Sequence, residues 1–332
     1  FGEGLASQMG WSDTAGLPIA IGITLAVSVL NYVGVRWGAR ANNLTSIIKV
    51  AALLAFVVMG PLVGQGEIGR LVDFGEVTGF SWAAFGLAMS PILFTYLGWN
   101  ASLYVAGEIR DPNRNIPGSL FLGLGLCSGI YLLVNAVYLY ALPLSELQGA
   151  TDAGQASALA LFGSYGGGLV ASFVLLSVLG TLNATVLVGP RIAYAMALDG
   201  LFFGGADRVH GVYGTPTAAI AVQAVVSIAL LLVLGNFPSA LDFTTFAILL
   251  ATTADIAALY RLRWRDPDRP RPYRAWGYPV VPALYGVANV AIAAALLWSR
   301  PFECLVGLGM LLAGLPFYWV FSRRRGAEAG PG

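Results

Sequence analysis

The segment 118–142, GSLFLGLGLCSGIYLLVNAVYLYAL, contains no Asp, Glu, Lys or Arg over its 25 residues. A helix rises about 1.5 Å per residue, so this stretch is long enough to cross the ~30 Å hydrocarbon layer of a bilayer. The polar segment DPNRNIP (111–117) precedes it, and PLSELQ (143–148) follows it. The segment therefore predicts a membrane-spanning helix with polar connections at both ends.

Eight further apolar runs flank this segment: 17–35, 45–64, 80–106, 168–198, 216–235, 240–260, 277–298 and 302–321. None shows the alternation of polar and apolar residues that a transmembrane barrel strand requires. The third and fifth runs along the chain exceed the length of a perpendicular helix, which predicts tilt, a break or an extension beyond the bilayer. The expected fold class is all-α, a polytopic helical membrane protein with nine transmembrane helices in a single domain.

The composition supports this class and excludes others. Of 332 residues, 57% are hydrophobic and only 11% are charged, whereas soluble domains are about 25% charged. A net charge of +1 gives no reason to expect a nucleic-acid partner. With two Cys and one His, we expect no metal site, no cofactor and two free thiols, Cys127 and Cys304. Residues 1–16 contain no Cys, so an accessory subunit is not indicated.

The arginines predict the orientation in the membrane. Fifteen of the 17 arginines lie on one set of connections or at the C-terminal end, and the opposite set carries only Arg70 and Arg300. Because positive connections stay in the cytoplasm, the start of the chain is expected outside and the tail 322–332 inside. The cell membrane, in a bacterium the inner membrane, is the expected location. The proline- and arginine-rich stretch 261–276 is read as a cytoplasmic loop that anchors the topology or contacts anionic lipid.

The third apolar run contains features that oppose a regular helix. Pro91 removes a backbone donor, Gly98 weakens a helix by about 1 kcal/mol relative to Ala, and Asn100 lies at membrane depth. Irregular backbone at that depth is tolerated where it lines a cavity or is buried in protein. The run therefore predicts a break at residues 96–100, either as a binding site for ions or zwitterions or as a kink packed through Gly98.

Lys49 is the second exception, because an ammonium inside an apolar run is costly. It either extends toward the cytoplasm or acts as a fixed cation or proton carrier. Ser177, Thr181 and Thr185 recur at four-residue spacing, so their hydroxyls share one helix face that can meet this lysine or bond their own helix. Asp255 is read as neutralised by a nearby arginine or by water, with a proton-linked role left open.

Four stretches together resemble the amino acid–polyamine–organocation superfamily of permeases, and the GWN motif with the following EIRDPNRNIP looks most like its L-type branch. They are NYVGVRWGARANNLTSIIKVAAL (31–53), LFTYLGWNASLYVAGEIRDPNRNIP (93–117), GTLNATVLVGPRIAYAMALDG (180–200) and RPYRAWGYPVVP (271–282). The resemblance implies a leucine-transporter-like fold with two inverted repeats. It also implies that the chain corresponds to family spans 4 to 12, so that it is truncated at its N-terminus. Residues 17–64 would then be a remnant of the first repeat, 80–260 the second repeat, and 277–321 two additional spans.

The resemblance also assigns half of a substrate site to the predicted break. Phe94 matches the aromatic gate over the substrate, and its carbonyl and that of Leu97 would receive the substrate ammonium. Gly98, Trp99 and Asn100 match the unwound segment beside the side-chain pocket. Leu97 departs from the Gly that L-type members often have, which affects the expected size of the substrate side chain.

Two further groups of residues are assigned by resemblance alone. Lys49 matches a lysine that occupies the place of a sodium ion, and Thr181 and Thr185 match the hydroxyls that face it. Glu108 and Arg191 match cytoplasmic residues that would tie helices together when the carrier faces outward.

The resulting hypothesis is a secondary transporter of amino acids that works by alternating access, independently of sodium, by exchange or with a proton. The alternative is a proton-coupled polyamine or cationic amino-acid permease. An intramembrane enzyme is disfavoured because neither a histidine nor paired carboxylates lie at membrane depth in the predicted spans. A channel is disfavoured because the sequence shows no filter loop.

Overall fold

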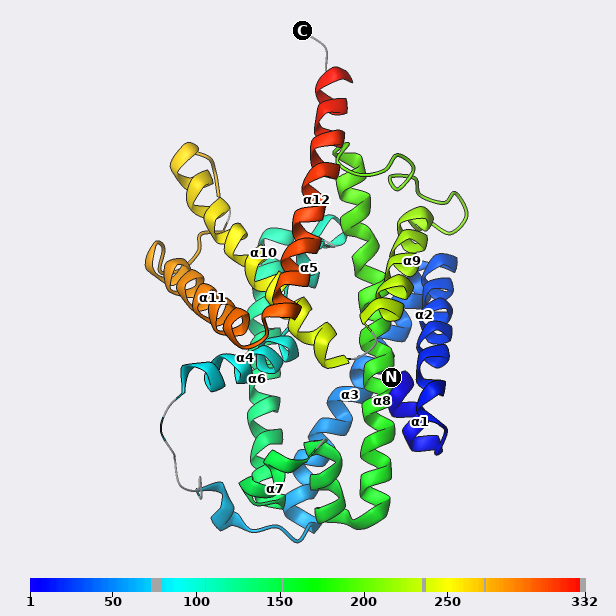
Figure 1. The fold of residues 1–332 in the computed structure, drawn as a ribbon, viewed down its shortest axis with the longest axis vertical. Helices are drawn as coiled ribbons and strands as arrows, with labels where there is room; N and C mark the ends of the chain where they lie inside the picture. Colours follow the sequence, from blue (N-terminus) through cyan, green and yellow to red (C-terminus); the bar gives the residue numbers. More distant parts are fainter. Residues whose placement is uncertain are drawn as a thin grey trace. The chain divides into compact units, whose positions relative to one another are not determined.

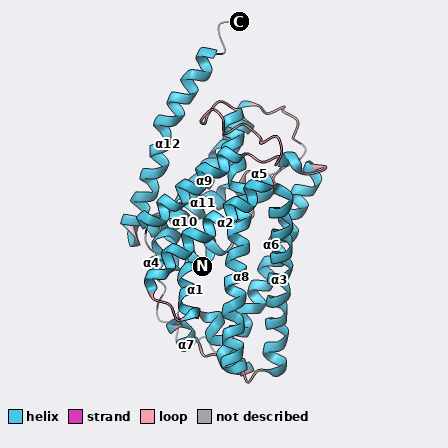
Figure 2. Ribbon diagram, turned by 90° about the vertical axis from the view of Figure 1, so that its right-hand side faces the viewer, coloured by secondary structure: helices cyan, strands magenta, loops and turns pink. Residues whose placement is uncertain are grey.

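A computed structural model of the protein describes residues 1–72, 79, 81–104, 106–150, 152–234, 237–271 and 273–328. These residues form helices, turns and loops, and none of them forms a β-strand (Figure 2). The helices are α1 Gly2–Met9, α2 Gly16–Val33, α3 Val35–Val63, α4 Trp82–Thr95, α5 Ala101–Tyr104, α6 Pro112–Ala141, α7 Leu144–Gly149, α8 Ala153–Leu198, α9 Thr217–Leu234, α10 Phe237–Arg265, α11 Val280–Ser299 and α12 Pro301–Glu328. The predicted all-α class is confirmed.

Each of the nine predicted apolar runs contains a helix. Among the described residues, seven helices are long and apolar enough to cross a membrane: α2, α3, α6, α8, α10, α11 and α12. The two remaining runs form the shorter apolar helices Trp82–Thr95 and Thr217–Val233. Many large apolar side chains on these helices are exposed, as a lipid-facing surface requires. The chain is a multi-pass membrane protein.

The connections between the predicted spans are shorter than the sequence suggested. Only Gly34 separates α2 from α3, so Arg36 and Arg40 lie in the first turns of α3 and not in a loop. Residues 143–167, which connect the predicted spans 118–142 and 168–198, contain α7 and the first turns of α8. Hydropathy detects apolar residues, but polar residues also form helices because the helix satisfies their backbone groups.

The chain divides into two compact units, which are described separately. The first comprises the described residues of Phe1–Thr78, Phe121–Asp199 and Phe203–Leu231. In this unit α3 packs along α8, and α2 contacts both helices (Figure 1). The close approach requires Gly180 on α8, because a Cβ atom there would lie 2.6 Å from the hydroxyl oxygen of Thr45 on α3.

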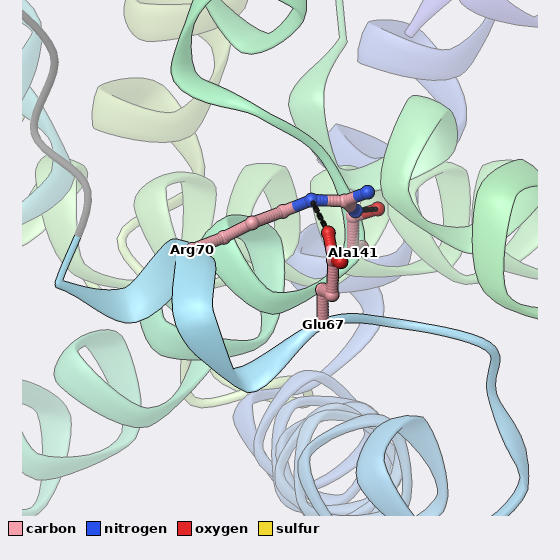
Figure 3. A network of polar contacts seen from close by, with 3 residues as sticks. All are labelled: Glu67, Arg70 and Ala141. Atoms are coloured by element: carbon pink, nitrogen blue, oxygen red, sulfur yellow. Dashed lines mark hydrogen bonds and ion pairs between the residues drawn. The ribbon is translucent and has the colours of Figure 1, made fainter.

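A polar contact fixes the connection that follows α3. Arg70 pairs its Nε with Glu67 at 3.1 Å and donates from Nη1 to the carbonyl of Ala141 at 2.8 Å (Figure 3). Ala141 is the last residue of α6, where helix carbonyls lack intrahelical partners and favour a positive charge. Arg70 therefore stabilises the end of α6.

The second unit comprises the described residues of Gly79–Leu120, Gly200–Phe202 and Leu232–Gly332. Its helix α11 packs against α4, α10 and α12. The buried core of this unit comes from α10, α11 and α12: Phe246, Leu249, Ile292, Ala293, Leu296 and Cys304. This core supports α4, whose Met89 and Leu93 pack against it.

Candidate functional site

The break predicted after α4 is present. Ser81 caps the start of α4 by accepting a hydrogen bond from the Ala84 N–H at 3.4 Å, and the helix ends at Thr95. Residues 96–100 form turns. The Leu97 N–H donates to the Phe94 carbonyl at 3.1 Å, which is a three-residue spacing and not the four-residue spacing of an α-helix.

Gly98 determines the direction of the chain in this break. Its φ angle is 102°, a value that side chains with a Cβ rarely adopt, although no atom lies within 4 Å of an added Cβ. The chain then enters α5, where the Asn100 amide donates to the Tyr104 hydroxyl at 2.7 Å. Leu97 and Trp99 are more than one-third exposed. The break thus presents backbone and side-chain groups outside a regular helix, as a binding segment requires.

Lys49 lies much deeper in its helix than the sequence indicated. The apolar run 45–64 placed it about one turn from the cytoplasmic end, whereas it lies fourteen residues from either end of α3 (Val35–Val63). That separation is about 21 Å at 1.5 Å per residue, and the lysine stem reaches roughly 6 Å. Extension of the ammonium beyond an end of this helix is therefore excluded.

The ammonium instead meets the hydroxyl face of α8. Lys49 Nζ donates to Thr181 Oγ1 at 2.9 Å, and the Thr181 hydroxyl in turn donates to the Ser177 carbonyl at 3.1 Å. Thr185, one turn further along, donates to the Thr181 carbonyl at 3.0 Å. The two sequence interpretations are thus both realised: the hydroxyls bond their own helix, and one of them also accepts from the lysine. Of the two predicted threonines, Thr181 is the one with this bond.

A cavity of about 170 Å³ adjoins this contact within the first unit. Lys49 and Ser177 contribute polar atoms to its lining, and Tyr138 and Asp152 add two polar groups that the sequence did not single out. The remaining walls are largely apolar and include Ile48, Ala52, Leu53, Phe56, Val170, Phe173, Val174 and Leu176. In such surroundings an ammonium depends on its hydrogen-bond partner, because the apolar walls cannot solvate it.

The sequence of most of the chain matches a known family. The family model described as "Amino acid permease" matches residues 4–313, which is most of the chain. The chain belongs to the amino acid permease family. Membership places it among transporters and not among enzymes, and it agrees with the resemblance to the L-type branch.

Several curated proteins are similar to this permease. The serine/threonine exchanger SteT of Bacillus subtilis (strain 168) is 29% identical over 329 residues, which cover 98% of this chain and 74% of SteT. The human large neutral amino acids transporter small subunit 2 is 27% identical over 301 residues, covering 89% of this chain and 55% of the relative. The human cystine/glutamate transporter is 28% identical over 303 residues, covering 91% of this chain and 60% of the relative. The chain thus spans between about half and three quarters of the length of these relatives.

A buried pair of amides in the permease was not predicted. Asn31 on α2 donates from Nδ2 to Asn183 Oδ1 on α8 at 2.9 Å, and Asn183 donates from Nδ2 to the Gly38 carbonyl on α3 at 2.9 Å. Both side chains are less than 5% exposed. The pair therefore joins α2, α3 and α8. Asn183 is two residues from Thr181, so it lies on another face of α8.

The remaining predicted residues of the permease lie in both units. Arg191 donates to the Leu187 carbonyl of its own helix, and it belongs to the first unit. Glu108 belongs to the second unit, and its side chain lies outside the described part of the structure. Asp255 is exposed on α10. Cys127 and Cys304 are free thiols, as expected.

Proposed function

We propose that this permease carries amino acids across the membrane by alternating access and without sodium. The observation that carries the proposal is the bond from Lys49 to Thr181 at the middle of α3. A fixed positive charge at that depth takes the electrostatic role that a bound metal cation has in sodium-coupled carriers. Movement of substrate is then coupled to a second substrate, as in exchange, or to a proton.

The break after α4 supplies the substrate half-site in this proposal. The carbonyls of Phe94 and Leu97 receive the substrate ammonium, because carbonyl groups at a helix break carry partial negative charge. The substrate side chain packs against Phe94 and Trp99, beside the unwound residues Gly98 and Asn100. The conformation of Gly98 and the end of α4 at Thr95 support this assignment.

The printed names of the relatives support amino acids as the substrate class, since they name serine and threonine, large neutral amino acids, and cystine with glutamate. The alternative, a permease for cationic amino acids or polyamines, would place a cationic substrate in a chain that carries a positive charge at the middle of α3. That charge favours zwitterionic or anionic amino acids over cations.

The proposed orientation has the first residues outside and the C-terminal end in the cytoplasm of a cell-membrane protein. It rests on the asymmetry of the arginines. In the outward-facing state, Glu108 and Arg191 would form a cytoplasmic ion pair that holds the helices together.

Counterflow in proteoliposomes tests the proposal. Vesicles loaded with an unlabelled amino acid should accumulate the same labelled compound, whereas empty vesicles should not. The panel should include serine, leucine, glutamate, cystine, arginine and putrescine. Counterflow of a zwitterionic or anionic amino acid is expected. Steady conductance without counterflow would contradict a carrier, and counterflow of arginine or putrescine alone would favour the cationic alternative.

A further inference from the structure

The second unit contains a partly buried carboxylate that no part of the proposed transport site uses. Asp242 lies near the start of α10, and its side chain is only 15% exposed. Its Oδ1 accepts a hydrogen bond from Ser90 Oγ on α4 at 2.7 Å, and its Oδ2 lies 3.9 Å from Nε of Arg300. Arg300 is the residue between α11 and α12. One carboxylate therefore joins α4, α10 and the turn between α11 and α12.

The partners of this carboxylate are held in place by their surroundings. Ser90 is fully buried. The backbone of Arg300 is fixed on both sides, because its N–H donates to the Leu296 carbonyl at 2.7 Å and its carbonyl accepts from Cys304 at 3.2 Å. A carboxylate withdrawn from water is costly unless it is paired and hydrogen-bonded, and Asp242 has both kinds of partner.

Ser90 lies on the face of α4 that packs against the rest of the unit. Gly86 is one turn before it, and a Cβ atom on Gly86 would lie 2.2 Å from the Cβ of Ala295 on α11. Phe94 is one turn after Ser90, and the helix ends one residue later. Residues at four-residue spacing share one helix face. The bond from Ser90 to Asp242 is thus one helical turn before Phe94, and the break that carries the rest of the proposed substrate half-site begins two residues after Phe94.

We propose that Asp242 is a positioning residue for that half-site, which makes this inference rest on the proposed function. Its carboxylate holds Ser90, and thereby sets where α4 ends and how the Phe94 and Leu97 carbonyls are presented. Arg300 lies close enough to balance the charge of the carboxylate that accepts from Ser90. Loss of the contact leaves the end of α4 free to shift, and a shift of about 1 Å is enough to weaken binding at a site built from fixed dipoles.

Four variants separate this role from a general effect on folding. Ser90→Ala removes the donor and leaves the charge pair. Asp242→Ala removes both contacts, whereas Asp242→Asn keeps an acceptor for Ser90 and loses the charge. Asp255→Asn is the matched control, because Asp255 is an exposed carboxylate on the same helix.

Hydrogen exchange followed by mass spectrometry reads the position of α4 independently of transport. Peptides that cover 88–104 should exchange faster in Ser90→Ala and Asp242→Ala, by about tenfold or more, with peptides from α3 and α8 unchanged. Asp255→Asn should match the wild type. Unchanged exchange over 88–104 in both Ser90→Ala and Asp242→Ala would overturn the proposal. If Asp242→Ala does not fold, Ser90→Ala decides the question alone.

Transport kinetics then test the link to the substrate. Ser90→Ala and Asp242→Ala should raise KM for the amino acid at least fivefold with a smaller change in maximal rate, and Asp242→Asn should recover part of the loss. A fall in maximal rate at unchanged KM would overturn the positioning role. If the wild type carries no amino acid, the proposed function fails, while the exchange measurement still shows whether Asp242 holds α4.

Discussion

Replacement of Lys49 by alanine removes the ammonium that donates to Thr181 at 2.9 Å in the middle of α3. A hydrogen bond that involves a charged group contributes about 1.5–3 kcal/mol. If the bond is made in one transport conformation and not in the other, its loss shifts their equilibrium by that amount, or about 10- to 150-fold. We therefore expect the exchange rate of Lys49→Ala to fall by one to two orders of magnitude. The protein should still fold, because the Thr181 hydroxyl keeps its bond to the Ser177 carbonyl.

A double-mutant cycle measures the contact itself. Thr181→Val removes the acceptor at nearly constant shape, and the cycle combines it with Lys49→Ala. The two single changes should be strongly non-additive, with a coupling energy of about 1.5–3 kcal/mol in the exchange rate. Thr185→Val is the matched control, since its hydroxyl donates to the Thr181 carbonyl one turn away, whereas Lys49 donates to the Thr181 hydroxyl.

The assay is exchange of a labelled amino acid by the purified protein in proteoliposomes, normalised to the amount that elutes as a single species in detergent. Wild-type exchange kinetics in Lys49→Ala would refute the reasoning. Additive effects of Lys49→Ala and Thr181→Val would also refute it, because they would show that the contact is not used in the cycle.

Three further predictions concern the surrounding backbone and packing. Gly98→Ala should raise KM severalfold, because its φ of 102° costs a residue with a Cβ about 1–3 kcal/mol; substrate titration measures this. Asn183→Ala should lower the free energy of unfolding by about 1–3 kcal/mol for each buried partner that it leaves without a hydrogen bond. The melting temperature in detergent should fall accordingly, and an unchanged melting temperature would contradict the role of the amide pair with Asn31. Gly180→Ala should impair exchange because its Cβ meets Thr45 at 2.6 Å, and adding Thr45→Ala should restore part of it.

The sequence was sufficient for the features that depend on local composition. Apolar runs of about twenty residues predicted the helices because the bilayer requires that length. Pro91, Gly98 and Asn100 were the reasons for predicting the break. The helix α4 continues through Pro91 and ends at Thr95, and Gly98 follows in the break with a φ of 102°. The four-residue spacing of Thr181 and Thr185 predicted a shared face, which the lysine contacts at Thr181.

The position of Lys49 within its helix and the contacts between residues far apart in the sequence were harder to predict. The helix that carries Lys49 starts earlier than the apolar run indicated, because hydropathy ignores the polar first turns of α3, which contain Arg36 and Arg40. Asp242 was read as part of an apolar run, and its partner Ser90 is 152 residues away in the sequence. Contacts over such separations depend on which helices pack against each other, and the spacing of residues within one segment does not predict that packing.

The central claim is a fixed lysine charge in a sodium-independent amino acid carrier. The most direct test is wild-type exchange in proteoliposomes with sodium on both sides, on one side, or fully replaced by choline at constant ionic strength and pH. The account predicts the same initial rate of exchange in all three conditions. A rate that falls tenfold or more when sodium is removed, or that follows the sodium gradient, would contradict it.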